Sequence, residues 1–132
     1  MSRFQSRAKG AKGERKACHA IKENCPSLRA ERNARNGKAC SDILVWVDGD
    51  EKHPVVFEVK RNERLDLGTT LMEKFRRQAE ADYAAGILWR PNGKSWRLDC
   101  LYFGQWVTFS GDAVWRMVER LVQDAPASPG RG

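Results

Sequence analysis

Two short segments decide the fold that this sequence predicts, Asp42-Ile-Leu-Val-Trp-Val47 and Val55-Val-Phe-Glu-Val-Lys60. Side chains along a β-strand alternate between its two faces. In both segments every odd-numbered position is apolar, which predicts two strands that share one buried face: Ile43, Val45, Val47, Val55, Phe57 and Val59. The intervening residues 48–54 contain glycine and proline and predict the turn of a hairpin.

The even-numbered face of this hairpin carries three charged residues, Asp42, Glu58 and Lys60. If the strands pair about a centre near Glu51, Asp42 lies opposite Lys60, and Leu44 lies opposite Glu58. Directly opposite Cβ atoms are about 5 Å apart, and diagonal ones about 7–8 Å. Two carboxylates on a half-buried face are costly unless a cation lies between them. We therefore interpret these residues as a divalent metal site with a lysine beside it.

The ligand types favour Mg²⁺, with Mn²⁺ as a substitute. Mg²⁺ prefers oxygen ligands and takes one or two carboxylates together with waters and phosphate oxygens. Asp42, Glu58 and the main-chain carbonyl of Val59 are the predicted ligands. Such an ion lowers the pKa of a bound water and polarises a phosphate ester. Lys60 is then placed to orient that water or to stabilise charge on the phosphate oxygens.

A helix is predicted from Gly10 to Asn24, and Pro26 stops it. Its inward stripe, at a spacing of three to four residues, contains Glu14, Ala17, Cys18 and Ile21. A carboxylate among apolar residues suggests a task, so we expect Glu14 to assist the metal site through water. The alternative is a solvated acid paired with a basic neighbour in the same helix.

The rest of the chain predicts an α/β fold in which helices flank a mixed sheet. Beyond the first helix and the hairpin, the expected elements are an edge strand over 28–35, a helix from Thr69 or Thr70 to Ala84, a hairpin about residues 91–94 and a helix over 111–124. Trp89 and Trp96 flank that second turn and are interpreted as a cross-strand pair that packs in the sheet. We expect one domain over 9–124, a flexible basic arm over 1–8 and a disordered tail over 125–132.

The positive charge is concentrated at one end of the chain. Residues 1–40 contain 11 Lys/Arg and 3 Glu, whereas the remaining 92 residues contain 13 Lys/Arg and 14 Asp/Glu. Such a segment next to a carboxylate site indicates a polyanionic partner, nucleic acid first. The alternative is a solvated basic tail with no partner. The predicted DNA contacts are Arg7, Lys9, Lys12, Arg15, Arg61 and Arg64.

The composition argues against a membrane-spanning protein and against a cysteine zinc site. No stretch approaches the roughly 20 apolar residues of a membrane span, so we expect a cytoplasmic protein with no membrane partner. The four cysteines lack CxxC spacing, and a zinc site from Cys18, Cys25 and Cys40 would fit no usual pattern. Reduced, buried thiols are the favoured interpretation.

The order of these motifs resembles the PD-(D/E)XK nuclease superfamily. A basic N-terminus leads into a helix with Gly10 and Glu14, an aspartate (Asp42) starts a strand, and Glu58-Val59-Lys60 ends the next. The resemblance is to the archaeal-type Holliday-junction resolvases and their phage relatives, with the VRR-type nucleases, suggested by Gln78, as second choice. It implies a restriction-endonuclease-like core and a Mg²⁺-dependent, homodimeric endonuclease. In it Asp42 and Glu58 bind metal, Lys60 is catalytic and Glu14 supports them.

The predicted substrate is therefore branched or junction DNA. A four-way junction has near two-fold symmetry and requires two cuts, which favours a C₂ dimer. Two alternatives stay open: a PD-(D/E)XK nuclease with another DNA substrate, and a non-catalytic nucleic-acid-binding protein on a nuclease fold.

Overall fold

Six strands form one sheet in the order β1-β2-β3-β4-β5-β6 in the computed structural model, which describes residues 3–33, 42–61, 69–91 and 94–125. The elements are α1 (Arg3–Asn24), β1 (Leu28–Arg32), β2 (Asp42–Val47), β3 (Val55–Arg61), α2 (Thr69–Ala81), β4 (Gly86–Arg90), β5 (Arg97–Tyr102), β6 (Gln105–Ser110) and α3 (Asp112–Gln123). Strands β3 and β4 are parallel, and the other neighbours are antiparallel. The parallel pair requires a crossover, and α2 lies within it. The predicted fold class, α/β with helices flanking a mixed sheet, is confirmed.

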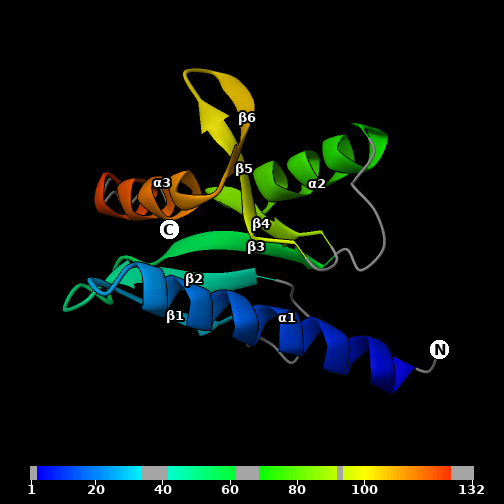
Figure 1. Ribbon diagram of the computed structural model, residues 1–132, viewed down its shortest axis with the longest axis horizontal. Coiled ribbons are helices and arrows are strands. Elements are labelled where there is room, and N and C mark those ends of the chain that lie inside the picture. The colour runs from blue at the N-terminus through cyan, green and yellow to red at the C-terminus, as the bar shows by residue number, and fades with distance from the viewer. Residues whose placement is uncertain (1–2, 34–41, 62–68, 92–93, 126–132) are drawn as a thin grey trace.

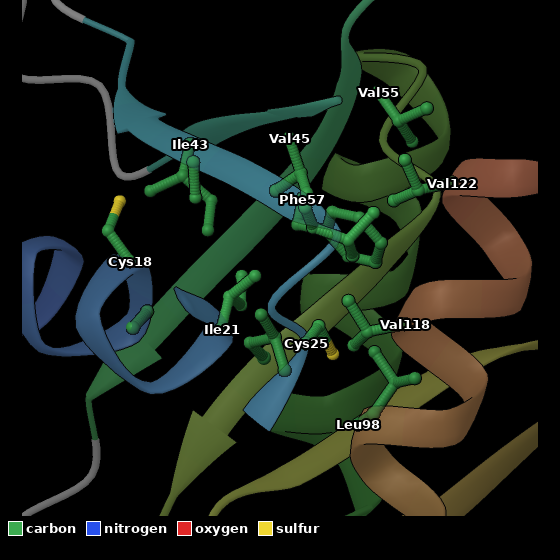
Figure 2. Packing of buried hydrophobic residues seen from close by; sticks show 14 of the residues in the cluster. Cys18, Ile21, Cys25, Ile43, Val45, Val55, Phe57, Leu98, Val118 and Val122 are labelled. Atoms are coloured by element: carbon green, nitrogen blue, oxygen red, sulfur yellow. The ribbon is translucent and has the colours of Figure 1, made fainter. Parts of the chain in front are cut away.

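The two faces of the sheet have separate apolar cores, and α1 and α2 lie on opposite sides of the sheet (Figure 1). The larger core joins the odd-numbered residues of β2 and β3 to α1 and α3 (Figure 2). Its helical members include Ile21 of α1 and Val118 of α3, both fully buried. The smaller core joins Met72 and Ala79 of α2 to Ile87 and Trp89 of β4. The alternation seen in the sequence therefore separates two different helical layers.

The β2–β3 hairpin has a different register from the predicted one. Asp42 pairs directly with Glu58, and Val45 pairs with Val55, so the predicted pairing of Asp42 with Lys60 is wrong by two residues. The turn is centred on Asp50, whose N–H donates to the carbonyl of Val47 over 2.8 Å. A shift by an even number of residues leaves every side chain on its predicted face. The correction brings the two carboxylates closer together than expected.

The first helix begins earlier than the sequence predicted. It starts at Arg3, so residues 3–8 are helical rather than a separate flexible arm. These residues include no proline or glycine, and basic residues such as Arg7 have good helix propensity. Within the described part of the chain, none of the helices is long and apolar enough to cross a membrane. The predicted tail lies outside the described residues except for Ala125.

The sheet also contains a strand that the sequence analysis missed. Strand β6 pairs with β5 through a two-residue turn in which Phe103 and Gly104 both have positive φ, 51° and 80°. Two positive φ values match a type I′ hairpin turn. The predicted pair of Trp89 with Trp96 is wrong, because Trp89 pairs with Arg97. Each indole instead packs beside a core, Trp89 in the α2 layer and Trp96 in the α1 layer.

Candidate functional site

The site is centred on Asp42, the first residue of β2. Asn33 follows β1 and holds this aspartate twice: its backbone N–H donates to the Asp42 carbonyl, and its Nδ2 donates to Oδ2, each over 3.1 Å. The other carboxylate oxygen, Oδ1, is buried and has no hydrogen-bond partner among the described residues. A buried carboxylate oxygen without a donor is costly. The arrangement leaves one oxygen of Asp42 available to a ligand.

Glu58 lies on β3 directly opposite Asp42 and is 2% exposed. Opposite Cβ atoms in an antiparallel pair are about 5 Å apart. Lys60 lies two residues further along the same face, with its Nζ 3.1 Å from Oε1 of Glu58. The structure thus brings Asp42, Glu58 and Lys60 together as the sequence predicted. Val59, the third predicted ligand, has its side chain in the opposite core, so only its main chain is available.

Helix α2 places two further residues on Lys60. The Nζ of Lys60 donates a hydrogen bond to Oε1 of Gln78 over 3.3 Å and lies 4.9 Å from the centroid of the Phe75 ring. Phe75 and Gln78 are three residues apart and therefore share one side of the helix. A carboxylate, an amide and an aromatic face hold the ammonium group from different directions. Sequence analysis connected Gln78 only with the second-choice resemblance and missed Phe75.

Glu14 is buried as predicted, at 3% exposed, but on the α1 side of the sheet. Its Oε1 is 3.1 Å from Nε of Arg32, at the end of β1. Burial raises the pKa of Glu14, the hydrogen bond and charge of Arg32 lower it, and the negative charge of Asp42 raises it further, so that the net shift is upward. The charge of Asp42 therefore acts on Glu14, but the counterion of Glu14 is Arg32. Its predicted role at the metal stays a prediction.

Another buried acid, Asp99, lies in the same row across the sheet. Glu58 pairs with Ile87, and Ile87 pairs with Asp99. Asp99 is 0% exposed and accepts a hydrogen bond from Nε of Arg76 on α2 over 3.1 Å. Burial raises its pKa, although the hydrogen bond and charge of Arg76 oppose this. The pair fastens α2, and with it Gln78 and Phe75, to the sheet.

The donor set fits a hard divalent cation. Two carboxylates face each other from neighbouring strands, and one has a buried oxygen without a partner. Mg²⁺ takes one or two carboxylates and fills its other positions with water or phosphate oxygens. Among residues 3–33, 42–61, 69–91 and 94–125, no three His, Cys, Asp or Glu side chains are grouped to hold a metal. The set is therefore two carboxylates, with Glu14 outside it.

The cysteines do not form a metal site in the described part of the chain. Cys18, Cys25 and Cys100 are free and buried, as predicted, and burial raises the pKa of each thiol to about 11. Over the described ranges, these cysteines are not part of any group of three or more His, Cys, Asp or Glu side chains that could hold a metal. Cys40 lies outside the described residues.

The predicted DNA contacts are only partly described. Lys12 and Arg15 are exposed on α1. Arg7 and Lys9 are in the same helix, and Arg61 ends β3, but the side chains of these three residues lie outside the description. Arg64 lies outside the described residues altogether.

Comparison with known proteins adds a structural likeness. No family model matches the sequence, and neither does any curated protein. The chain is similar to the structure of Hjc, a Holliday junction resolvase from the archaeal hyperthermophile Archaeoglobus fulgidus, with 19% identity and a TM-score of 0.41. The match covers 79% of this chain and 92% of the other. Because this likeness is distant, we base the proposed function on the carboxylate pair and its lysine.

Proposed function

We propose that this protein is a metal-dependent endodeoxyribonuclease that hydrolyses phosphodiesters, with branched or junction DNA as its substrate. The observation that supports this most is the pairing of Asp42 with Glu58, with Lys60 3.1 Å from the latter. A structural ion pair needs one carboxylate. The second carboxylate, with a buried oxygen that has no donor in the described residues, calls for a cation.

In this proposal Asp42, Glu58 and the main-chain carbonyl of Val59 hold Mg²⁺ or Mn²⁺. The ion supplies neutralisation of phosphate charge and an acidic bound water. Lys60 donates hydrogen bonds to the attacking water or to a non-bridging phosphate oxygen. Gln78 and Phe75 restrict its ammonium group to the side of the sheet that carries the carboxylates. Glu14, paired with Arg32, is close enough to Asp42 for the two charges to interact, and in this proposal it supports the metal site through water.

The test compares cleavage of a four-way junction and a linear duplex of the same sequence, with Mg²⁺, with Mn²⁺ and with EDTA. Glu58→Gln removes one carboxylate, and Glu51→Gln makes the same change in the exposed β2–β3 turn as a matched control. We expect metal-dependent cutting of the junction by the wild type and the control, and loss of at least about 100-fold in Glu58→Gln.

Cutting in EDTA, or undiminished activity of Glu58→Gln, would contradict the mechanism. Equal cutting of junction and duplex would contradict the substrate. Binding without any cutting would favour the non-catalytic alternative. Because a junction is cut twice about a two-fold axis, we also propose a homodimer, which light scattering at several protein concentrations tests.

A further inference from the structure

A basic groove lies beside α1, outside the carboxylate site. Its cavity volume is about 930 Å³; α1 forms one wall, and Arg90, residues 94–96 and the start of α3 form the other. Its lining includes five Lys or Arg side chains and only two carboxylates, Glu23 and Asp112. Glu23 is in contact with His19 over 3.1 Å. The groove therefore has a clear excess of positive charge.

The groove begins at the end of the sheet that carries the candidate site. Lys60 pairs with Trp89, and the next residue, Arg90, pairs with Arg61. On the α1 wall, Lys12 lies two residues before Glu14. From Lys12 to Asn24, the length of α1 that lines the groove, the helix rises about 18 Å. The carboxylates lie on the α2 face of the sheet and the groove on the α1 face, and both reach the same end of the sheet, so a polymer bound at the carboxylates reaches the groove around that end.

Two features prepare the groove for phosphate. The Nε of Arg90 donates to the carbonyl of Lys94 over 3.0 Å, and its guanidinium lies 5.6 Å from the Trp96 ring centroid. These contacts fix a planar group that suits phosphate oxygens. Trp96 and Trp115 are partly buried against the larger core. Their apolar surface lowers the local dielectric and strengthens the field of the cations.

We propose that this groove binds the sugar–phosphate backbone of one strand of a DNA duplex arm that extends from the carboxylate site; this inference rests on the proposed function. One strand carries a phosphate about every 3.4 Å of duplex axis, so 18 Å spans roughly five phosphates. The three cations on α1, Lys12, Arg15 and Lys16, lie within about 6 Å of helix rise, so the groove contacts most strongly the phosphates at its Lys12 end. Because both indoles pack on protein and Arg90 covers Trp96, the groove offers charge to a backbone rather than faces to unpaired bases.

The test measures binding in EDTA, where no cutting occurs, by fluorescence anisotropy over a range of salt concentrations. The probes are a labelled duplex of about 20 base pairs and the corresponding single strand. Arg15→Gln/Lys94→Gln removes one exposed cation from each wall. Lys52→Gln/Lys74→Gln removes two exposed cations that do not line the groove, from the β2–β3 turn and from α2, as a matched control.

Each lost phosphate contact lowers the slope of log K against log salt by ~0.9. We expect the groove variant to lose about 1.8 from the duplex slope and to bind roughly tenfold or more weakly at 0.1 M salt, with the control unchanged. An unchanged slope, or an equal loss in the control, would overturn the proposal. A loss on the single strand alone would also overturn it, because unpaired nucleotides would then occupy the groove.

Cleavage in Mg²⁺ is measured separately, so failure of the proposed nuclease function can be distinguished from failure of the proposed groove. A wild type that shows the predicted groove-dependent binding but never cuts would contradict the proposed function and support the groove. Normal cutting with no effect of the groove variant on binding would refute the groove alone.

Discussion

The ion pair of Arg76 with Asp99 provides a stringent test of how α2 is held against the site. Nε of Arg76 lies 3.1 Å from Oδ2 of Asp99, and Thr108 Oγ1 donates to Oδ1 over 3.5 Å. The carboxylate is completely buried, whereas the arginine side chain is 28% exposed. Removing the arginine therefore leaves a buried charge with one long hydrogen bond from the residues that the structure describes. We expect Arg76→Met to destabilise the protein by about 3 kcal/mol, the lower end for breaking a buried pair.

The double variant Arg76→Met/Asp99→Leu separates loss of the pair from loss of packing. Replacing both partners with apolar groups removes the buried, unpaired carboxylate, and such replacements often leave the free energy of unfolding unchanged. We expect the double variant to recover most of the stability lost in Arg76→Met. Urea unfolding followed by far-UV circular dichroism measures the free energy of unfolding of both variants. In a thermal scan, the single variant should melt roughly 10 °C below the wild type.

The pH dependence gives a second measurement on the same variants. Burial already raises the pKa of Asp99, and loss of Arg76 removes the larger of the two groups that oppose this shift, leaving only the hydrogen bond from Thr108. When the pKa of a carboxyl group is higher in the folded than in the unfolded protein, the free energy of unfolding decreases as the pH rises above the pKa of the unfolded state. The deficit of Arg76→Met should therefore shrink as the pH falls from 7 towards 4. A deficit under about 1 kcal/mol at pH 7, or a double variant no better than the single one, would refute the reasoning.

Three more expectations follow from the contacts around the site. Gln78→Ala should slow cleavage roughly tenfold with little change in KM, because it removes a hydrogen bond to the charged Lys60; equal kcat in single-turnover assays would contradict this. Because the folded pKa of Glu14 is raised, the stability of the wild type relative to Glu14→Gln should fall as the pH rises above about 4.5, and parallel stability curves for the two proteins would contradict the assignment. In a Cys40→Ser protein no thiol should react with a disulfide reagent at pH 8 until denaturant is added, since burial raises the pKa of the other three to about 11; rapid labelling of the folded protein would refute this.

The faces of the β2–β3 hairpin could be predicted from the sequence, and its register could not. Alternation assigns Asp42, Glu58 and Lys60 to one face whatever the exact pairing. The pairing depends on the geometry of the turn over 48–54, where glycine, aspartates and proline allow several loops. The observed centre at Asp50 moves each partner by two residues, which preserves the faces. The shared face of Asp42, Glu58 and Lys60 was therefore predicted correctly, and the pairing of the two strands wrongly.

Strand β6 shows a different limit. Its turn, Phe103-Gly104, places a non-glycine residue at positive φ, and phenylalanine is rarely found there. The usual signals for this turn are Asn-Gly or Asp-Gly, so Phe103-Gly104 is a weak local indication of a hairpin. Pairing with β5 over six residue pairs outweighs this local preference. The glycine before an alternating segment, Gln105–Ser110, was the signal that remained.

Glu14 shows why neighbouring residues in space were harder to predict than faces. The helical stripe correctly placed it inward, but its counterion, Arg32, comes from a different element at the end of β1. That contact depends on how α1 lies across β1, which no periodicity in either segment specifies. The same end of β1 leads into Asn33, which holds Asp42. One strand end thus neutralises the acid on the α1 side and orients the acid on the α2 side. The two carboxylates nearest to each other in the hairpin, Asp42 and Glu58, are left as the pair that a cation would join.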